Sequence, residues 1–349
     1  MGRGGDEAIT LAELKLLAET AGATVRGEVV QRRGSIRAST FLSKGKIEEI
    51  QERAREENAG LLLLDDDLSP AQHRTLEKEL EMRVIDRRSL ILDIFAKRAR
   101  TREARLQVEL AQLEYLLPRL TRMWEHLGRL GGGIGTRGPG ETQLEVDRRR
   151  IRERIARLKR DLEGVVRERR VQRKGRRDCF KVSLVGYTNA GKSTLFNALA
   201  HAHVYVEDRL FATLDPTTRV IAVEGRVRVL LTDTVGFIRK LPPNLIASFR
   251  ATLEEVTEAD LLLHVVDATE PDPDAHIEAV NGVLEGLGAL QRPRLLVFNK
   301  VDALHDEVTY LGLRAQHPGA VFVSAVTKEG LGTLRDEISR RLHGTEEGR

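Results

Sequence analysis

The stretch that decides the fold is "CFKVSLVGYTNAGKST", residues 179–194. Its first half is a run of apolar residues typical of a buried strand, and its second half fits G-x-x-x-x-G-K-[ST]. In that pattern a glycine-rich loop joins a strand to a helix, and the backbone N–H groups of the loop surround phosphate oxygens. The sequence therefore predicts a phosphate-binding P-loop at the end of a strand.

The loop residues have distinct expected roles. Lys192 is expected to neutralise the β- and γ-phosphate oxygens, and the Ser193 hydroxyl to bind Mg²⁺. The predicted phosphate contacts are Gly186, Tyr187, Thr188, Asn189, Ala190, Gly191, Lys192, Ser193 and Thr194.

Two further motifs follow, each at the end of an apolar run. "LLTDTVG" (230–236) ends in a D-x-x-G segment in which Asp233 can hold Mg²⁺ through water and the Gly236 N–H can sense the γ-phosphate. "LLVFNKVD" (295–302) places Asp302 where a carboxylate can accept from guanine N1–H and N2–H₂, which adenine cannot supply. The predicted contacts in these motifs are Asp233, Thr234, Val235, Gly236, Asn299, Lys300, Val301 and Asp302.

Two shorter segments complete the set. In "VFVSAV" (321–326) the Ala325 N–H can meet guanine O6, and in "LFATLDPTTR" (210–219) Thr213 can supply a second Mg²⁺ hydroxyl. The predicted contacts here are Phe211, Ala212, Thr213, Leu214, Asp215, Ser324, Ala325 and Val326. Because the elements stand in order at strand ends, the sequence predicts a doubly wound, mostly parallel α/β domain that binds GTP or GDP with Mg²⁺.

Phe237 follows Gly236 where Ras-like proteins have a water-positioning glutamine. A phenylalanine cannot orient water, so intrinsic hydrolysis of GTP is expected to be slow or organised in another way. Phe237 can also simply pack in the core, and the two interpretations are compatible. No catalytic residue is assigned beyond Lys192 and Gly236, which are expected to face the transition-state phosphate.

Upstream of the P-loop, large apolar residues, mostly leucines, recur at heptad spacing. Those from Leu106 to Leu127 and from Leu144 to Leu162 predict two helices that form an antiparallel hairpin, with Pro118 interrupting the first arm. The tip, 128–140, has seven glycines and contains a G-x-G-x-x-G spacing. A helix and not a strand precedes it, which argues against a dinucleotide site. It is either a flexible connector or a tip that approaches another surface.

Charge is unevenly distributed. Residues 1–178 carry 39 Lys/Arg against 30 Asp/Glu, and residues 179–349 carry 18 against 23. The segment 148–177 has 15 Lys/Arg and 4 Asp/Glu, which indicates a surface that contacts a polyanion, unless it is only a solvated helix face. The candidate RNA contacts are Arg129, Arg137, Arg148, Arg149 and Arg150.

Strands alternate with helices in the first hundred residues, which predicts a small α/β domain. The expected helices are 9–22, 44–58, 70–81 and 89–98, and the expected strands are 25–31, 60–65 and 82–86. The predicted domains are therefore 1–99, a basic helical hairpin at 100–177 and a GTPase domain at 178–345. Cys179 is the sole cysteine, and no apolar run reaches the roughly 20 residues that cross a bilayer. A cytoplasmic protein is therefore expected. It is also expected to be a monomer.

The motif set resembles the HflX family, ribosome-associated GTPases of the Obg-HflX group. The resemblance rests on stretches such as "GYTNAGKSTLFN", "DTVGFIRKLP", "GKIEEI" and "GGIGTRGPGETQLEVDRR", and it covers roughly residues 40–345. It implies an N-terminal effector domain, binding to ribosomal RNA of the large (50S) subunit, and splitting of stalled or idle 70S ribosomes. Asn189 stands where similar potassium-activated GTPases have asparagine, which implies a K⁺ site.

Other functions compete with this one. A signalling or scaffold GTPase would use the hairpin to bind a protein, and a membrane-linked GTPase would rest on peripheral basic attraction alone. A protein-binding hairpin is expected to expose apolar positions, whereas this one carries arginines. The chain ends soon after the last expected helix, which leaves no room for the extra C-terminal domain of some relatives.

Overall fold

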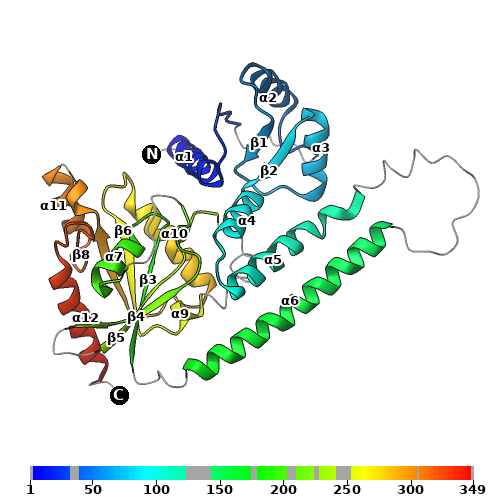
Figure 1. Cartoon of the computed structure of the whole chain (residues 1–349). Helices are drawn as coiled ribbons and strands as arrows, with labels where there is room; N and C mark the ends of the chain where they lie inside the picture. The colour runs from blue at the N-terminus through cyan, green and yellow to red at the C-terminus, as the bar shows by residue number, and fades with distance from the viewer. Residues whose placement is uncertain are drawn as a thin grey trace, which may run out of the picture. The chain divides into compact units, whose positions relative to one another are not determined.

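A computed structural model describes residues 3–31, 39–122, 143–173, 179–202, 210–223, 228–240, 253–304 and 306–346. The chain forms two compact units, one of residues 1–97 with 106–164 and the other of residues 98–105 with 165–349 (Figure 1). The domain limits expected near residues 99 and 177 stay predictions. Within the described ranges, no helix is long and apolar enough to span a membrane.

The second unit is built on a sheet whose described strands lie in the order β4-β5-β3-β6-β7-β8. Only β4 runs antiparallel to its neighbour, and the other pairs are parallel. The strands are β3 (Phe180–Gly186), β4 (Thr217–Ala222), β5 (Arg228–Asp233), β6 (Leu261–Asp267), β7 (Arg294–Asn299) and β8 (Val321–Phe322). This arrangement is the mostly parallel α/β fold that the motifs predict. Within "VFVSAV" (321–326) the strand is the two residues of β8, and Ser324 and Ala325 follow it.

The central strands are apolar because helices cover both faces of a parallel sheet. The helices of this unit are α7 (Lys192–Ala200), α9 (Glu254–Thr257), α10 (Pro273–Gly286), α11 (Glu307–Gln316) and α12 (Leu331–Glu346), with a short 3₁₀ turn, η5 (Val301–Ala303). Phe196 of α7 and Leu334 of α12 pack in the same core cluster, whereas Leu313 of α11 packs in another with Phe298.

The P-loop follows β3, which lies between β5 and β6. This is the point where the strand order reverses and ligands bind in such sheets.

The first unit has a two-stranded parallel sheet of β1 (Leu61–Leu64) and β2 (Arg83–Asp86). Its helices are α1 (Arg3–Ala21), α2 (Lys44–Glu56), α3 (Pro70–Leu80) and α4 (Arg87–Arg98). Ser69 and Gln72 form a capping box at the start of α3, which explains why that helix begins at Pro70. These helices match those expected from the sequence to within a few residues, except that α1 begins six residues earlier.

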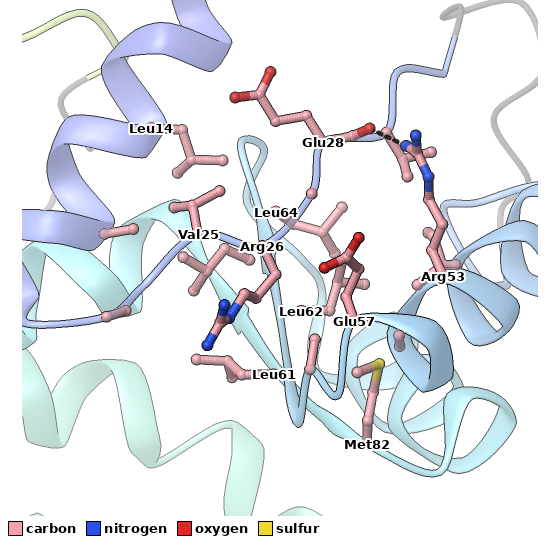
Figure 2. A pocket seen from close by; sticks show the side chains of 18 of the residues that line it. Leu14, Val25, Arg26, Glu28, Arg53, Glu57, Leu61, Leu62, Leu64 and Met82 are labelled. Atoms are coloured by element: carbon pink, nitrogen blue, oxygen red, sulfur yellow. Dashed lines mark hydrogen bonds between the residues drawn. The ribbon is translucent and has the colours of Figure 1, made fainter.

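The strand expected at 25–31 is wrong. These residues are irregular, and among the described residues β1 pairs only with β2. A cavity of about 410 Å³ is lined by both this segment and β1, including Val25, Leu61 and Leu62 (Figure 2). The Arg53 guanidinium of α2 donates to the Glu28 carbonyl oxygen at 2.6 Å. A β-rich sequence forms a strand only where a hydrogen-bonding partner is within reach, and here a side-chain contact holds the segment instead.

The hairpin helices are α5 (Arg102–Leu116), followed by the 3₁₀ turn η2 (Arg119–Arg122), and α6 (Gln143–Arg173). They run in opposite directions (Figure 1), and α5 ends just before Pro118. Two ion pairs join the helices, Arg154 to Glu109 at 2.7 Å and Lys159 to Glu114 at 2.8 Å. The tip loop 128–140, with Arg129 and Arg137, lies outside the described residues.

Candidate functional site

The P-loop backbone has a shape that requires glycine. Gly191 has φ 85°, and a Cβ there would lie 2.2 Å from the Asn299 side-chain nitrogen. Lys192 is the first residue of α7, and its ammonium group donates to the Tyr187 carbonyl oxygen at 2.7 Å. The loop therefore folds around the lysine, and its amino group is held at the N-terminus of a helix, where anions bind favourably.

Lys192 is buried beside the second motif. Burial lowers the pKa of its ammonium group to about 8, partly opposed by the nearby Asp233 carboxylate. A Cβ built on Gly236 would lie 3.1 Å from the Lys192 nitrogen and 2.7 Å from the Thr188 Cα. The structure thus brings together Lys192 and Gly236, the two groups expected to face the terminal phosphate.

Ser193, Thr213 and Asp233 meet at one point. The Ser193 hydroxyl lies 2.7 Å from the Thr213 hydroxyl and donates to an Asp233 carboxylate oxygen at 2.6 Å, and the Thr213 hydroxyl donates to that same oxygen at 3.2 Å. The other Asp233 oxygen is buried and has no hydrogen-bond partner among the described residues. Burial raises the pKa of this carboxyl group. Because Mg²⁺ takes hard oxygen ligands that lie about 3 Å apart in its octahedron, two hydroxyls and a carboxylate at these spacings fit that ion.

Phe237 joins switch II (residues 233–236) to the P-loop. Its carbonyl oxygen accepts from the Thr188 N–H at 2.7 Å, and its own N–H donates to the Gly186 carbonyl oxygen at 3.1 Å. Its side chain is fully buried. In switch I (residues 211–215), the Phe211 N–H donates to the Thr188 hydroxyl at 2.9 Å. Phe237 therefore packs in the core beside switch II, and its effect on hydrolysis stays a prediction.

The third and fourth motifs are tied together by Asn299. Its side-chain nitrogen donates to the Ala190 carbonyl oxygen, and its side-chain oxygen accepts from the Ala325 N–H, both at 3.0 Å. Lys300 forms an ion pair with Asp267 at 2.5 Å, and Asp302 is exposed to solvent. In this structure the Ala325 N–H donates to the Asn299 side chain. Recognition of guanine O6 by the Ala325 N–H therefore stays a prediction.

The predicted nucleotide residues differ in their exposure. Buried are Gly186, Tyr187, Thr188, Ala190, Lys192, Phe211, Leu214, Asp233, Thr234, Val235, Gly236, Asn299, Ser324 and Ala325. Partly buried are Gly191, Ser193, Thr194, Ala212, Thr213, Asp215, Lys300 and Val301. Exposed are Asn189, Asp302 and Val326. The P-loop and switch residues thus form a mostly buried cluster, while the base-reading side chain is open to solvent.

Sequence reasoning missed a contact that supports the P-loop. The Tyr187 ring stacks on the His276 imidazole of α10 with ring centres 3.9 Å apart, and the Tyr187 hydroxyl accepts from the Arg239 N–H at 2.9 Å. Burial lowers the pKa of His276, which favours the neutral ring. Tyr187 and His276 are far apart in the sequence, so no local pattern could have indicated this pair.

Two cavities differ in their chemistry. The one bounded by Thr188, Lys192, Thr213 and Gly236 measures about 50 Å³, against about 410 Å³ for the one in the first unit. The larger one has leucines at its wall, with Arg26, Glu28, Arg53 and Glu57 among its charged residues (Figure 2). The smaller one has the backbone N–H groups, lysine and hydroxyls that phosphate binding needs.

The fold and the site define the class of protein, a P-loop GTPase. A family profile described as "50S ribosome-binding GTPase" matches residues 181–300. Two further profiles, "GTP-binding GTPase N-terminal" and "GTP-binding GTPase Middle Region", match residues 8–96 and 98–176. The chain is therefore an enzyme that binds and hydrolyses GTP.

The chain belongs to the HflX family of GTPases. It is 51% identical over 335 residues to GTPase HflX of Caldanaerobacter subterraneus subsp. tengcongensis, covering 95% of this chain and 77% of that protein. It is 50% identical over 337 residues to GTPase HflX of Escherichia coli, covering 96% and 79%. Among solved structures it is similar to a GTP-binding protein from the hyperthermophilic archaeon Sulfolobus solfataricus in complex with GDP, with 25% identity, 96% of each chain covered and a TM-score of 0.49.

Proposed function

We propose that this GTPase binds the large ribosomal subunit and uses GTP to split stalled or idle 70S ribosomes in the cytoplasm, acting as a monomer. The observation that carries the proposal is the cationic surface of α6. Arg149 and Arg150 have side chains 57% and 70% exposed, and they form intrahelical ion pairs with Glu153 at 3.8 Å and with Asp147 at 3.7 Å. Arginines placed in this way can exchange weak intrahelical contacts for RNA phosphates.

In this proposal the nucleotide lies across the P-loop, the switches and the base-reading loop. Lys192 and the loop N–H groups hold the phosphates, and Asp302 reads guanine. Ser193, Thr213 and Asp233 hold Mg²⁺, with Asp233 acting through water, and the ion supplies positive charge to the β- and γ-phosphates. The convergence of these oxygens and the unpartnered Asp233 oxygen support the metal assignment.

Asn189 is the proposed K⁺ ligand. Asn189 is exposed at the P-loop, so its side chain is accessible from solvent. Its backbone has φ 63°. A monovalent cation there would supply the charge that an arginine finger supplies in other GTPases. Turnover is expected to be faster in K⁺ than in Na⁺, and equal rates at matched ionic strength would remove this part of the proposal.

The alternative is a GTPase whose hairpin binds a protein. Ionic contacts to RNA phosphates weaken steeply with salt, because binding releases counterions. An apolar protein interface has no such dependence. A peripheral membrane attachment through the same cationic surface is distinguished by binding to anionic vesicles in the absence of ribosomes.

The experiment is co-sedimentation of the full chain with 50S subunits over a range of salt concentrations. Replacing Arg148, Arg149 and Arg150 together by Glu is expected to weaken binding and to reduce the salt slope by roughly one per lost phosphate contact. A control with the same charge change at the exposed Lys15, Lys78 and Arg314 is expected to have a smaller effect. Salt-independent binding, or equal losses in both variants, would favour the protein-binding alternative.

A further inference from the structure

Asp215 lies at the end of switch I, and its carboxylate bonds to the start of the hairpin. One carboxylate oxygen accepts from the Arg100 N–H at 3.1 Å and from the Thr101 N–H at 3.2 Å. The other accepts from the Thr101 hydroxyl. All three residues belong to the same compact unit. Three hydrogen bonds therefore hold the end of switch I against residues 100 and 101.

Thr101 is the residue immediately before α5. Its hydroxyl oxygen accepts from the Ala104 N–H at 3.1 Å, and its carbonyl oxygen accepts from the Arg105 N–H at 3.1 Å. These are the contacts of a helix N-cap. The Thr101 hydroxyl thus accepts from the first turn of α5 and donates to Asp215. A carboxylate at this position is also favoured by the partial positive charge of the helix N-terminus.

The other end of the same short segment lies at the proposed metal site. Thr213 precedes Asp215 by two residues and contacts Ser193 and Asp233. Leu214 between them is 2% exposed, so the intervening residue is packed in the core. A segment anchored at both ends over three residues has little freedom to satisfy one contact without the other. A conformation that brings Thr213 to the metal site therefore also brings Asp215 to Thr101.

The helix that Thr101 caps belongs to both units. Residues 98–105 are part of the unit that contains the P-loop, whereas α5 from Leu106 onward is part of the other. We infer that Asp215 couples the seating of Thr213 at the nucleotide site to the capping of α5, which makes Thr101 a positioning residue for the GTP-bound state. The inference rests on the metal role proposed for Thr213.

Coupling of this kind is reciprocal. A ligand that seats Thr213 stabilises the cap, and loss of the cap weakens that ligand by the same factor. GTP with Mg²⁺ engages Thr213 through the metal and the γ-phosphate, whereas GDP has no γ-phosphate. The cap is therefore expected to favour GTP over GDP.

The affinity test uses Thr101→Val in the full chain, which removes the hydroxyl while nearly keeping the shape of the side chain. Affinity for the GTP analogue guanylyl imidodiphosphate with Mg²⁺ is expected to fall on the order of fivefold, the effect of losing the hydrogen bond to Asp215, with GDP affinity unchanged. Thr101→Ser keeps the hydroxyl and is expected to behave like the parent. Thr309→Val is the matched control, because the Thr309 hydroxyl donates to the Asp306 carboxylate at the start of α11, far along the chain from switch I.

Amide hydrogen exchange of residues 98–105 supplies a second readout. In the parent, the Arg100 and Thr101 amides are expected to exchange more slowly with the analogue than with GDP, and Thr101→Val is expected to lose this difference. Equal exchange in the two nucleotide states of the parent would overturn the inference. An equal loss of analogue and GDP affinity in Thr101→Val, or no loss at all, would also overturn it.

Thr213→Ala separates failure of the inference from failure of the site on which it rests. If that variant keeps the parent affinity for the analogue, the metal role of Thr213 is wrong and the inference falls with it. If it loses affinity while Thr101→Val does not, only the inference is wrong. The measurements need no ribosomes, so their outcome is independent of the proposed ribosomal function.

Discussion

The Lys192 ammonium group has a pKa of about 8 because it is buried in the phosphate site. Bound phosphates favour the charged form, so the pKa of Lys192 is higher in the GTP complex than in the free protein. GTP affinity should therefore be full below about pH 8 and fall above it, approaching tenfold per pH unit. Nucleotide titrations across this range check the prediction, and an affinity that does not change with pH would contradict it.

Lys192→Ala is the companion variant for this prediction. No other side chain of the loop supplies a cation, so productive GTP binding should be lost together with its pH dependence. Circular dichroism of the variant verifies that it folds. Unchanged GTP affinity and turnover would remove Lys192 from the site.

Asp302 is exposed at the end of the NKVD motif, where a bound base can reach it. In Asp302→Asn an amide donor replaces an acceptor, which suits xanthine and not guanine. Loss of the carboxylate hydrogen bonds should cost guanine binding roughly 1.5–3 kcal/mol. Competition between GTP and XTP measures the change, and the two affinities should move in opposite directions. If they move together, Asp302 does not read the base.

The sequence indicated candidate site residues because each motif carries its own local signal, and the structure brings Ser193, Thr213 and Asp233 together. It could not predict contacts between residues far apart in the chain. Arg87 is an example, since its buried guanidinium pairs with Glu13 at 2.7 Å and with Asp65 at 2.6 Å. A buried cation needs such partners, but only the fold shows which carboxylates come within reach. The bonds of Asp215 to Thr101 were hidden for the same reason.

At the scale of elements, a strand could be predicted from the sequence where its packing imposes a pattern on the residues. The apolar runs of β3, β5 and β7 were predictable because burial on both faces requires them. No strand was predicted at β6, although every one of its residues is buried. His264 lies in the middle of β6, and burial lowers its pKa to about 3, so the ring is neutral and compatible with the core. The segment 25–31 has the composition of a strand but lacks a ladder partner among the described residues. Composition alone does not report whether a partner exists.

The hairpin gives the prediction that belongs to this scale. Replacing residues 131–138 by a short Gly-Ser turn should leave GTP binding by the free protein nearly intact, because these residues lie outside every nucleotide motif. Ribosome splitting should fall sharply, since the shortened tip would no longer reach an RNA-lined cavity. Residual binding through the arms should survive at low salt and weaken as salt rises.

Arg137→Glu is the milder companion, because it keeps the length of the tip and reverses one charge. Splitting should fall in this variant as well. If both variants split ribosomes as well as the parent, the tip is only a connector. If the replacement instead abolishes GTP binding, the tip contributes to the nucleotide site.

At the scale of the whole molecule, the two units share the helices α5 and α6. Residues 98–105 and 165–173 lie with the P-loop, and the rest of these helices lies with the first unit. In the coupling inferred above, a nucleotide-dependent change in switch I would act on the hairpin through the backbone of α5. This arrangement suits a GTPase whose nucleotide state controls a remote surface.

We propose that GTP binding by this chain drives separation of ribosomal subunits. The most direct measurement is the splitting of purified 70S ribosomes by the full chain, followed by light scattering in GTP, in GDP and in guanylyl imidodiphosphate. The account predicts rapid splitting with GTP and little with GDP, while the analogue shows whether GTP binding alone is sufficient. Equal splitting in GTP and GDP, or intact 70S particles in all three nucleotides, would contradict it.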